Sequence, residues 1–434
     1  MFRSEIDRLI HWKNAKSRKP LIIRGARQVG KTWLMKEFAK TEYKQTLYIN
    51  FESSAHLTDI FNADFDIQRI LTALQIETGV IATKESTLII FDEIQEAPKA
   101  ITSLKYFYEN EPEYHIVAAG SLLGVTMHQQ VSFPVGKVEF LDLYPLNFVE
   151  FLKALKQDQL VSLLETYNVE LIKSFKSKFI NFLKQYYFIG GMPEAVLSFV
   201  LNNDFAEVRT IQKTILQAYE QDFSKHAPVD IVPRIRMVWN SIPSQLAKEN
   251  RKFIYGLIKE GARAKDFELA INWLMDSGLV HKINRINKPA IPLKAYADLS
   301  AFKLFIVDVG LLNAMGNIEL KTLLEGNAIF TEFKGAVTEQ FVLQQLVCNN
   351  MFDIYYWSAD KSTAELDFVV QYKNTVVPIE VKAEENLQAK SLKVFHQKYN
   401  TPLTVRTSMS DYRKESWLTN IPLYLMNCLY NEIN

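Results

Sequence analysis

The sequence predicts an α/β protein with a parallel sheet at its N-terminal end, a helix-rich middle and a small α/β part at its C-terminal end. Three observations predict this order. Short apolar runs alternate with segments of helical period between residues 20 and 143, as in a doubly wound sheet. Helical period then dominates to about residue 247, and short apolar strands return after residue 353. With 434 residues, 48% of them hydrophobic, the chain is long enough for about three domains, which we expect at 1–150, 151–300 and 301–434.

The first apolar run leads into a glycine-rich loop. Residues 20–24 favour a buried strand and residues 33–40 an amphipathic helix, and the loop between them fits the pattern GxxxxGK[ST]. The loop consists of Gly25, Ala26, Arg27, Gln28, Val29, Gly30, Lys31 and Thr32. Its glycines let backbone N–H groups point at phosphate oxygens, and the helix N-terminus adds partial positive charge.

This loop therefore predicts a nucleoside triphosphate site. Lys31 would reach the β- and γ-phosphates, and Thr32 would ligate magnesium. The alternative is an ordinary glycine-rich turn, which the flanking strand and helix disfavour.

Two acids end another strand, predicted at residues 87–93. Asp92 could hold magnesium through water, and Glu93 could polarise an attacking water. Such a pair is common by itself, and the loop upstream gives it this interpretation. A strand at 115–121 ends in Ser121, which could sense the γ-phosphate or cap a helix. Ligands of a parallel sheet bind beyond the carboxyl ends of its strands, where all these residues fall.

The remaining elements of the N-terminal part complete this pattern. Further strands are predicted at 46–51 and 138–143, and helices at 1–14, 66–78 and 98–110.

Several motifs together resemble the prokaryotic AAA-type ATPases that end in a domain of unknown function, relatives of the archaeal ATPase group. They are the phosphate loop, Phe-Asp-Glu-Ile-Gln at 91–95, Ala-Gly-Ser-Leu at 119–122, the run at 136–146 and Gly-Gly-Met-Pro-Glu at 190–194. The resemblance covers nearly the whole chain. It implies that Asp92 binds magnesium, that Glu93 activates water and that subunits can associate. Relatives commonly have arginine where this chain has Lys137, and lysine lacks the planar, two-pronged contact that arginine could make with a neighbouring subunit's nucleotide.

The middle of the chain reads as helices up to about residue 247, followed by the rhythm of a winged helix at 251–286. We expect a helix at 253–258, a turn at Gly261, a second helix at 265–276 and a strand from Leu279. In the second helix, helical spacing puts three apolar residues in the core and three polar ones outside, namely Phe267, Ile271 and Leu274 against Lys265, Glu268 and Asn272. Residues 234–294 carry twelve Lys and Arg against five Asp and Glu. This segment could contact DNA, or its charges could simply be solvated helix faces.

A second constellation lies near the C-terminal end. A helix is predicted at 331–347 with Glu339, and strands at 354–357, 364–370 and 376–382. Period-two alternation puts Glu380 and Lys382 on one face, onto which Asp367 of the neighbouring strand can converge. Two carboxylates could bind magnesium while the lysine orients water for attack on a phosphodiester.

This layout is similar to the PD-(D/E)XK nuclease fold. The short D…ExK signal is degenerate, and a surface ion pair of Lys382 with an acid is the alternative. The same residues could also serve as a docking site for nucleic acid or nucleotide without cleavage.

Composition and charge bear on the cellular compartment and on the partners that we expect. Cys348 and Cys428 lie far apart in sequence and suggest neither a disulfide framework nor a zinc site, which fits a reducing cytoplasm. The N-terminus is charged, and no apolar run approaches transmembrane length, so we expect neither secretion nor a membrane partner. The net charge of +1 by itself argues neither for nor against nucleic acid.

The leading hypothesis is a cytoplasmic ATPase that uses ATP and Mg²⁺. Its turnover would be coupled to DNA or a protein partner, in a single copy or a homo-oligomer. A nucleotide-switched binding module with slow hydrolysis is one alternative, and an ATP-gated, metal-dependent nuclease is another.

Overall fold

The computed structural model describes residues 1–53, 56–121, 124, 133–248, 252–325, 331–359, 363–385 and 388–433. They form two compact units. The N-terminal unit comprises Arg3–Tyr144 and Asp276–Leu279, and the C-terminal unit comprises Met1–Phe2, Pro145–Met275 and Val280–Asn434. Residue 122 of the Ala-Gly-Ser-Leu motif and residue 251 of the predicted winged helix lie outside the described residues. The division into three domains stays a prediction.

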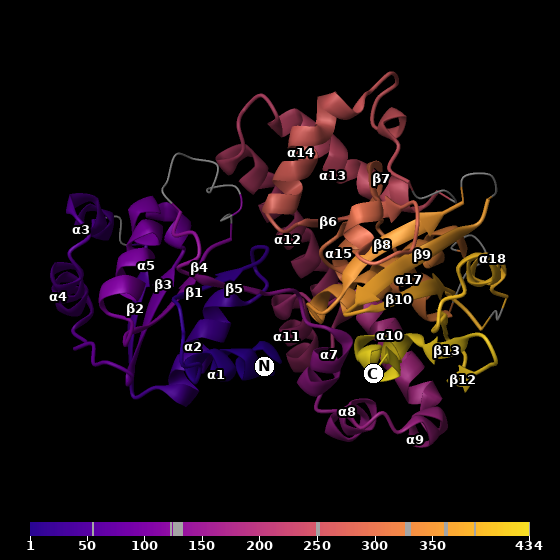
Figure 1. Cartoon of the computed structure of the whole chain (residues 1–434), viewed down its shortest axis with the longest axis horizontal. Coiled ribbons are helices and arrows are strands. Elements are labelled where there is room, and N and C mark those ends of the chain that lie inside the picture. The colour runs from indigo at the N-terminus through magenta and orange to yellow at the C-terminus, as the bar shows by residue number, and fades with distance from the viewer. Residues whose placement is uncertain are drawn as a thin grey trace. The chain divides into compact units, whose positions relative to one another are not determined.

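The N-terminal unit contains a five-stranded, fully parallel sheet in the order β2-β3-β4-β1-β5 (Figure 1). Its strands are β1 Leu21–Arg24, β2 Gln45–Asn50, β3 Thr87–Asp92, β4 His115–Ala119 and β5 Glu139–Asp142. Each overlaps a run predicted as a strand, so the parallel α/β fold is confirmed.

Helices cover both faces of this sheet. They are α1 Glu5–Lys13, α2 Lys31–Glu42, α3 Leu57–Ala63, α4 Ile67–Thr78 and α5 Pro98–Asn110. Apolar side chains of α3, α4 and α5 share one core with strand residues such as Ile116. On the other face the ring of Trp12 from α1 lies 6.3 Å from Phe38 of α2 and 6.1 Å from His115 of β4. Because His115 and Ile116 are adjacent in a strand, they point to opposite faces.

The strand order decides which loops meet at the carboxyl edge of the sheet. β4 lies between β1 and β3. The segment with Ser121, which follows β4, is therefore placed between the glycine-rich loop after β1 and the acids at the end of β3.

The C-terminal unit begins with helices, as expected, and contains further helices between and after its strands. They are α7 Phe148–Ala154, α8 Asp158–Glu165, α9 Val169–Ser174, α10 Lys176–Ile189, α11 Pro193–Asn202, α12 Phe205–His226, α13 Val232–Leu246, α14 Ala264–Asp276, α15 Val309–Met315, α16 Leu320–Glu325, α17 Thr331–Cys348, α18 Lys390–Tyr399 and α19 Tyr430–Ile433. The last residue of α14 is counted in the N-terminal unit. None of the helices within the described ranges has the length and apolar character that crossing a membrane requires.

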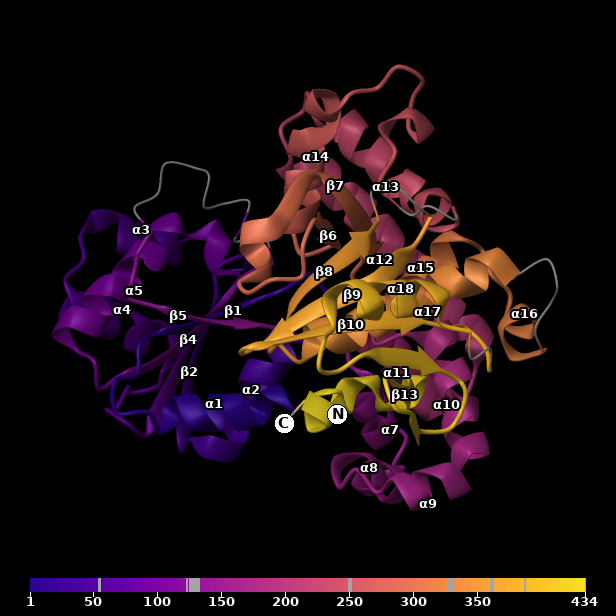
Figure 2. The same ribbon diagram turned by 45° about the vertical axis from the view of Figure 1, so that its right-hand side comes forward.

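A mixed eight-stranded sheet forms the other layer, in the order β12-β13-β11-β10-β9-β8-β6-β7. Its strands are β6 Val280–Ile286, β7 Ala297–Ile306, β8 Asp353–Ser358, β9 Glu365–Tyr372, β10 Thr375–Val381, β11 Val405–Ser408, β12 Arg413–Lys414 and β13 Thr419–Pro422. Helices α17 and α18 both pack against β10 (Figure 2).

The predicted winged helix is only partly present. The expected helix at 253–258 is wrong: the chain there forms a single 3-10 turn, Tyr255–Leu257, with Gly256 at its centre, where a helix would lose stability. The second helix forms as α14, with Phe267, Ile271 and Leu274 buried and Lys265, Glu268 and Asn272 exposed, as predicted. The following strand, β6, pairs with both β7 and β8 and so belongs to the large sheet rather than to a free wing.

The Gly-Gly-Met-Pro-Glu motif has a structural role in the C-terminal unit. The N–H of Gly191 donates to Asp308 Oδ2 at 2.6 Å, and its carbonyl accepts from Leu146 N at 2.7 Å. Gly190 has φ +73° and lies so close to Asp308 that a Cβ would be 2.1 Å from Oδ1. Asp308 also caps α15 through Leu311 N, and its burial raises the pKa of its carboxyl group. The motif thus joins α7, α10 and α15.

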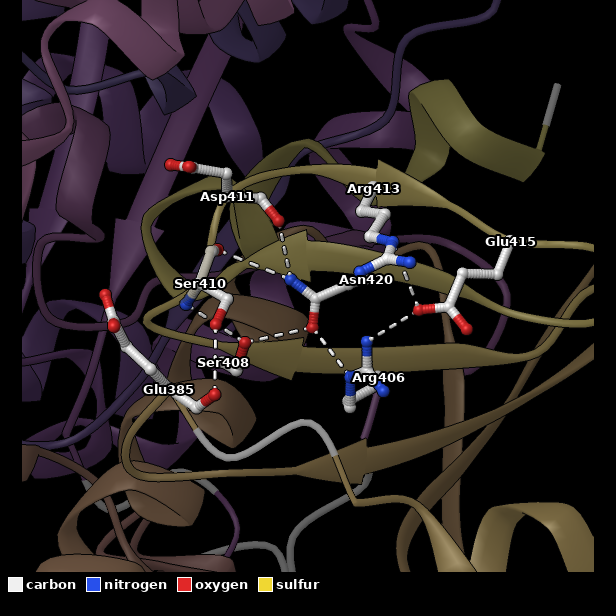
Figure 3. A network of polar contacts seen from close by, with 8 residues as sticks. All are labelled: Glu385, Arg406, Ser408, Ser410, Asp411, Arg413, Glu415 and Asn420. Carbon is white, nitrogen blue, oxygen red and sulfur yellow. Dashed lines mark hydrogen bonds and ion pairs between the residues drawn. The ribbon is translucent and has the colours of Figure 1, made fainter.

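A second polar network braces β11 and β13 (Figure 3). Asn420 Oδ1 accepts from Arg406 Nε and from Ser408 Oγ, both at 2.9 Å, and its amide nitrogen donates to the carbonyl of Asp411 at 2.9 Å. Arg406 is 2% exposed and also donates to Glu415 Oε1 at 3.3 Å. Because these groups satisfy one another inside the fold, we interpret the network as structural.

Candidate nucleotide site

The glycine-rich loop has the backbone that its sequence requires. β1 ends at Arg24, and α2 begins at Lys31. Gly25 has φ +148°, and a Cβ there would lie 2.2 Å from the carbonyl oxygen of Leu143. Gly30, at the start of α2, has φ +97°. Only glycine adopts both conformations at low cost, and the resulting turn points the first N–H groups of α2 toward the loop.

Lys31 lies across this loop. It is 6% exposed, and its ammonium donates to the carbonyl oxygens of Gly25 at 3.0 Å and Ala26 at 2.7 Å. Burial lowers the pKa of Lys31 to about 8, while the nearby carboxylates of Glu93 and Asp92 act in the opposite direction. The same donors could transfer to phosphate oxygens, which would replace the carbonyls as acceptors.

Asp92 is held by two donors at the end of β3. It is 2% exposed; its Oδ2 accepts from the hydroxyl of Tyr48 at 2.8 Å, and its Oδ1 accepts from Glu93 N at 3.1 Å. Tyr48 is in β2, so the neighbouring strand orients the acid. Burial first, and then the hydrogen bond to Asp92, raises the pKa of the Tyr48 phenol, which stays a donor at neutral pH.

Glu93 follows with a left-handed backbone, φ +50°. Its Oε2 accepts from Gln95 Nε2 at 2.6 Å and from Ser121 Oγ at 3.4 Å. The structure thus places Lys31, Glu93 and Ser121 at one edge of the sheet, together with Asp92. Thr32, the predicted magnesium ligand, is half-buried in the first turn of α2. Hydroxyl and carboxylate oxygens are donors that suit Mg²⁺ when phosphate oxygens and water complete its shell.

Lys137 is engaged within its own chain. Its ammonium pairs with Glu109 Oε1 of α5 at 2.9 Å and lies 5.4 Å from the ring centroid of Tyr108. A contact of Lys137 with a neighbouring subunit stays a prediction.

Sequence reasoning missed the residues that hold the loop from outside. Arg3 is 3% exposed and donates to the carbonyl of Val29 at 2.9 Å and of Tyr144 at 2.6 Å. Arg24 forms a two-pronged ion pair with Asp142, at 2.8 and 2.9 Å, which joins β1 to β5. No local pattern marks Arg3, because its partners are far away in the sequence.

A distant segment also packs on the loop. Asp276–Leu279 belongs to the N-terminal unit. Gly278 has φ +73°, and a Cβ on it would lie 3.0 Å from Ala26 N and 3.5 Å from Gly25 C. This segment joins α14 to β6 along the chain.

The second predicted constellation assembles in part. The register of β9 and β10 pairs Phe368 with Ile379, which makes Asp367 and Glu380 the next positions along the ladder. Lys382 Nζ lies 2.7 Å from Glu380 Oε1, and Asp367 Oδ2 accepts from the N–H of residue 381 at 2.7 Å. Burial raises the pKa of Glu380, Lys382 lowers it and Asp367 raises it again.

Glu339 does not join this group as expected. It is 3% exposed and lies 4.0 Å from the ammonium of Lys303, which is fully buried and pairs with Glu365 at 2.6 Å. Within the described residues, no three or more His, Cys, Asp or Glu side chains gather to hold a metal. Of the expected set, Glu380 and Lys382 form an ion pair at the end of the strand next to Asp367, whereas Glu339 lies near Lys303; a metal site formed by all four residues stays a prediction.

Three family models match separate parts of the chain. Residues 17–152 match an AAA domain, residues 180–322 a domain of unknown function (DUF8612) and residues 334–426 a domain of unknown function (DUF4143). No protein of curated function matches the sequence at a significant level. The PD-(D/E)XK resemblance of the C-terminal part stays a prediction.

Several solved structures resemble the chain weakly. The Walker-type ATPase PABY2304 of Pyrococcus abyssi is 14% identical, with 73% of this chain and 95% of that chain covered, at a TM-score of 0.47. The Aeropyrum pernix ORC1 protein in complex with DNA is 14% identical, over 73% and 92%, at 0.27. Drosophila ORC bound to DNA is 13% identical, over 75% and 96%, at 0.29. These TM-scores are all below 0.5, which is too low to assign the fold of these proteins to this chain.

The AAA match covers the elements that form the candidate nucleotide site. The matched AAA segment contains both the glycine-rich loop and the acids at the end of β3. The AAA match and the candidate nucleotide site therefore lie in the same part of the chain.

Proposed function

We propose that the chain binds Mg²⁺ and ATP at residues 25–32 and hydrolyses the bond between the β- and γ-phosphates. The observation that carries this proposal is the meeting of a glycine-rich loop, a buried lysine and two acids at one sheet edge. Lys31 reaches Gly25 and Ala26, its pKa responds to Asp92 and Glu93, and Ser121 contacts Glu93. These are the parts that phosphoryl transfer needs.

Each residue has a distinct role in this proposal. The amides at the start of α2 and the ammonium of Lys31 bind phosphate oxygens and stabilise charge that develops on them. Thr32 and Asp92 hold Mg²⁺, which would neutralise phosphate charge, and Tyr48 fixes the carboxylate of Asp92. Glu93 takes the proton of the attacking water, and Ser121 lies beside it.

Substitution of Lys31 and Glu93 separates binding from turnover. Lys31→Ala should weaken ATP affinity about 10- to 100-fold, because charge-assisted hydrogen bonds are lost. Glu93→Gln should bind ATP with parental affinity and turn over about 10²- to 10⁴-fold more slowly. Glu96→Gln, an exposed acid on the same turn, is the matched control. Parental turnover in Glu93→Gln would contradict the role of this residue.

Hydrolysis would be coupled to a partner. The ion pair of Lys137 with Glu109 favours a nucleotide-switched protein with slow hydrolysis over a rapidly hydrolysing ATPase, since Lys137 already has a partner within its own chain.

The exposed face of α14 mixes Lys265 with Glu268, which favours a protein-contact or structural role over DNA reading. Turnover that rises on addition of double-stranded DNA would instead favour a DNA-driven ATPase. A cytoplasmic location and self-association also stay predictions.

A second candidate function is metal-dependent cleavage of DNA by the C-terminal unit. The observation that favours it is the convergence of Asp367, Glu380 and Lys382 on neighbouring strands. Plasmid incubated with Mg²⁺ or Mn²⁺ should be nicked by the parent protein and not by Asp367→Ala. Intact plasmid with the parent protein would reject this candidate and leave the ATPase proposal untouched.

A further inference from the structure

Gln95 makes an unusual contact inside the proposed ATPase site. It lies on the 3-10 turn Ile94–Glu96 directly after Glu93 and is 7% exposed. Its amide nitrogen donates to Glu93 Oε2 at 2.6 Å, and Ser121 Oγ reaches the same oxygen at 3.4 Å. In the part of the chain that the structure describes, Glu93 Oε1 receives no hydrogen bond, and Glu93 is half-buried.

The buried amide of Gln95 is not needed to complete the hydrogen bonding of the fold. Its own oxygen, Oε1, is buried and has no donor among the described residues. The amide nitrogen must face Glu93, because a carboxylate accepts hydrogen bonds and an amide oxygen there would repel it. The polar end of Gln95 therefore serves Glu93 alone, and an apolar side chain of similar length would fit the fold at least as well.

We propose that Gln95 is a positioning residue for the general base: it anchors Oε2 of Glu93 so that Oε1 is presented to the attacking water. This inference rests on the proposed ATPase function. A general base is effective only when it is held within hydrogen-bond reach of the proton that it takes. The left-handed backbone of Glu93 places its side chain next to this turn, and the amide then selects one orientation of the carboxylate.

The first test removes the donor and keeps the volume. Gln95→Met should lower kcat by about tenfold or more, as loss of a partner that orients a catalytic group does. The Kd for ATP should stay within about twofold and the Tm should not fall, because Gln95 contacts the base rather than the nucleotide and loses an unpaired oxygen. Gln68→Met is the matched control, since Gln68 Nε2 makes the same kind of contact to Glu111 at 2.9 Å on the surface.

The second test replaces the donor by a negative charge. Gln95→Glu keeps the length of the side chain and puts a second carboxyl group beside Glu93, so the two groups repel and Glu93 is displaced. The kcat of Gln95→Glu should therefore fall further than that of Gln95→Met, whereas a merely structural role would make the loss follow the Tm.

The outcomes distinguish this inference from the ATPase proposal. Parental kcat in Gln95→Met or in Gln95→Glu would overturn the positioning role while the loss of turnover in Glu93→Gln still stands. A fall in Tm that accounts for the lost activity would overturn it as well. A parent protein without turnover would overturn the ATPase proposal, and this inference with it.

Discussion

Lys31 shows how much of the proposed chemistry is decided by single residues. Its ammonium is buried between two loop carbonyls and within electrostatic reach of Asp92 and Glu93. Burial disfavours the charged form, so the pKa falls to about 8 although both acids favour that form. Lys31 is therefore only partly protonated near pH 8, and a bound anion would favour its charged form.

ATP binding should therefore take up a proton at Lys31. The group is partly neutral above about pH 8 in the free protein, and the negative phosphates would raise its pKa in the complex. ATP binds the charged form of Lys31 more tightly than the neutral form. Because the neutral form predominates at higher pH, the Kd for ATP should rise about tenfold between about pH 7 and about pH 9. Calorimetry in two buffers of different ionisation enthalpy measures the uptake. Lys31→Arg, which stays charged, should show none, and equal uptake in that variant would contradict the assignment.

At the scale of elements, strand pairing orients the acids. β2 and β3 are parallel neighbours that pair Tyr48 with Ile90 and Asn50 with Asp92. Tyr48 and Asp92 therefore lie diagonally on one face, close enough for the hydroxyl to reach the carboxylate at 2.8 Å. The edge strand of the sheet thus orients Asp92, the proposed magnesium ligand.

Tyr48→Phe should raise the Mg²⁺ concentration needed for half-maximal turnover by about tenfold, because an orienting partner of the ligand is lost. Titration of turnover with Mg²⁺ at saturating ATP measures this. Tyr43→Phe is the control, since it removes the hydroxyl of another half-buried tyrosine, which is hydrogen-bonded to His115 at 2.7 Å and not to Asp92. An unchanged titration in Tyr48→Phe would show that Asp92 needs no such support.

At the scale of the whole molecule, the phosphate loop is touched by a segment about 250 residues away in sequence. Gly278 approaches Ala26 so closely that no side chain fits without movement. Asp276–Leu279 also connects α14 to β6 along the chain, so the close approach depends on residues far from the loop in sequence.

Gly278→Ala should lower ATP affinity about tenfold by displacing the loop amide of Ala26, which a phosphate-binding turn requires. Gly261→Ala is a matched control, because Gly261 has φ +75° against +73° and no atom within 4 Å of its added Cβ. Both variants should lose about 1 kcal/mol of unfolding free energy from the left-handed backbone. Equal ATP affinities in the two variants would contradict a role of the Gly278 contact.

The sequence by itself determined the N-terminal fold and the positions of the residues that meet at one edge of its sheet. Glycines at 25 and 30, apolar strands and acids at a strand end are local requirements, and local backbone geometry obeys them. The pairing of Glu380 with Lys382 was predictable for the same reason, since strand alternation is local. The 3-10 turn at 255–257 and the place of β6 in the large sheet were not, because pairing partners decide them.

Only the tertiary structure decided which distant groups surround these residues. Arg3 at Val29, Gly278 at Ala26 and Lys303 at Glu339 join segments that no sequence period relates. The contact of Gln95 with Glu93 is near in sequence, yet it depends on the left-handed backbone of Glu93 and on which way the amide points. Packing fixes such orientations, and packing is a property of the whole fold.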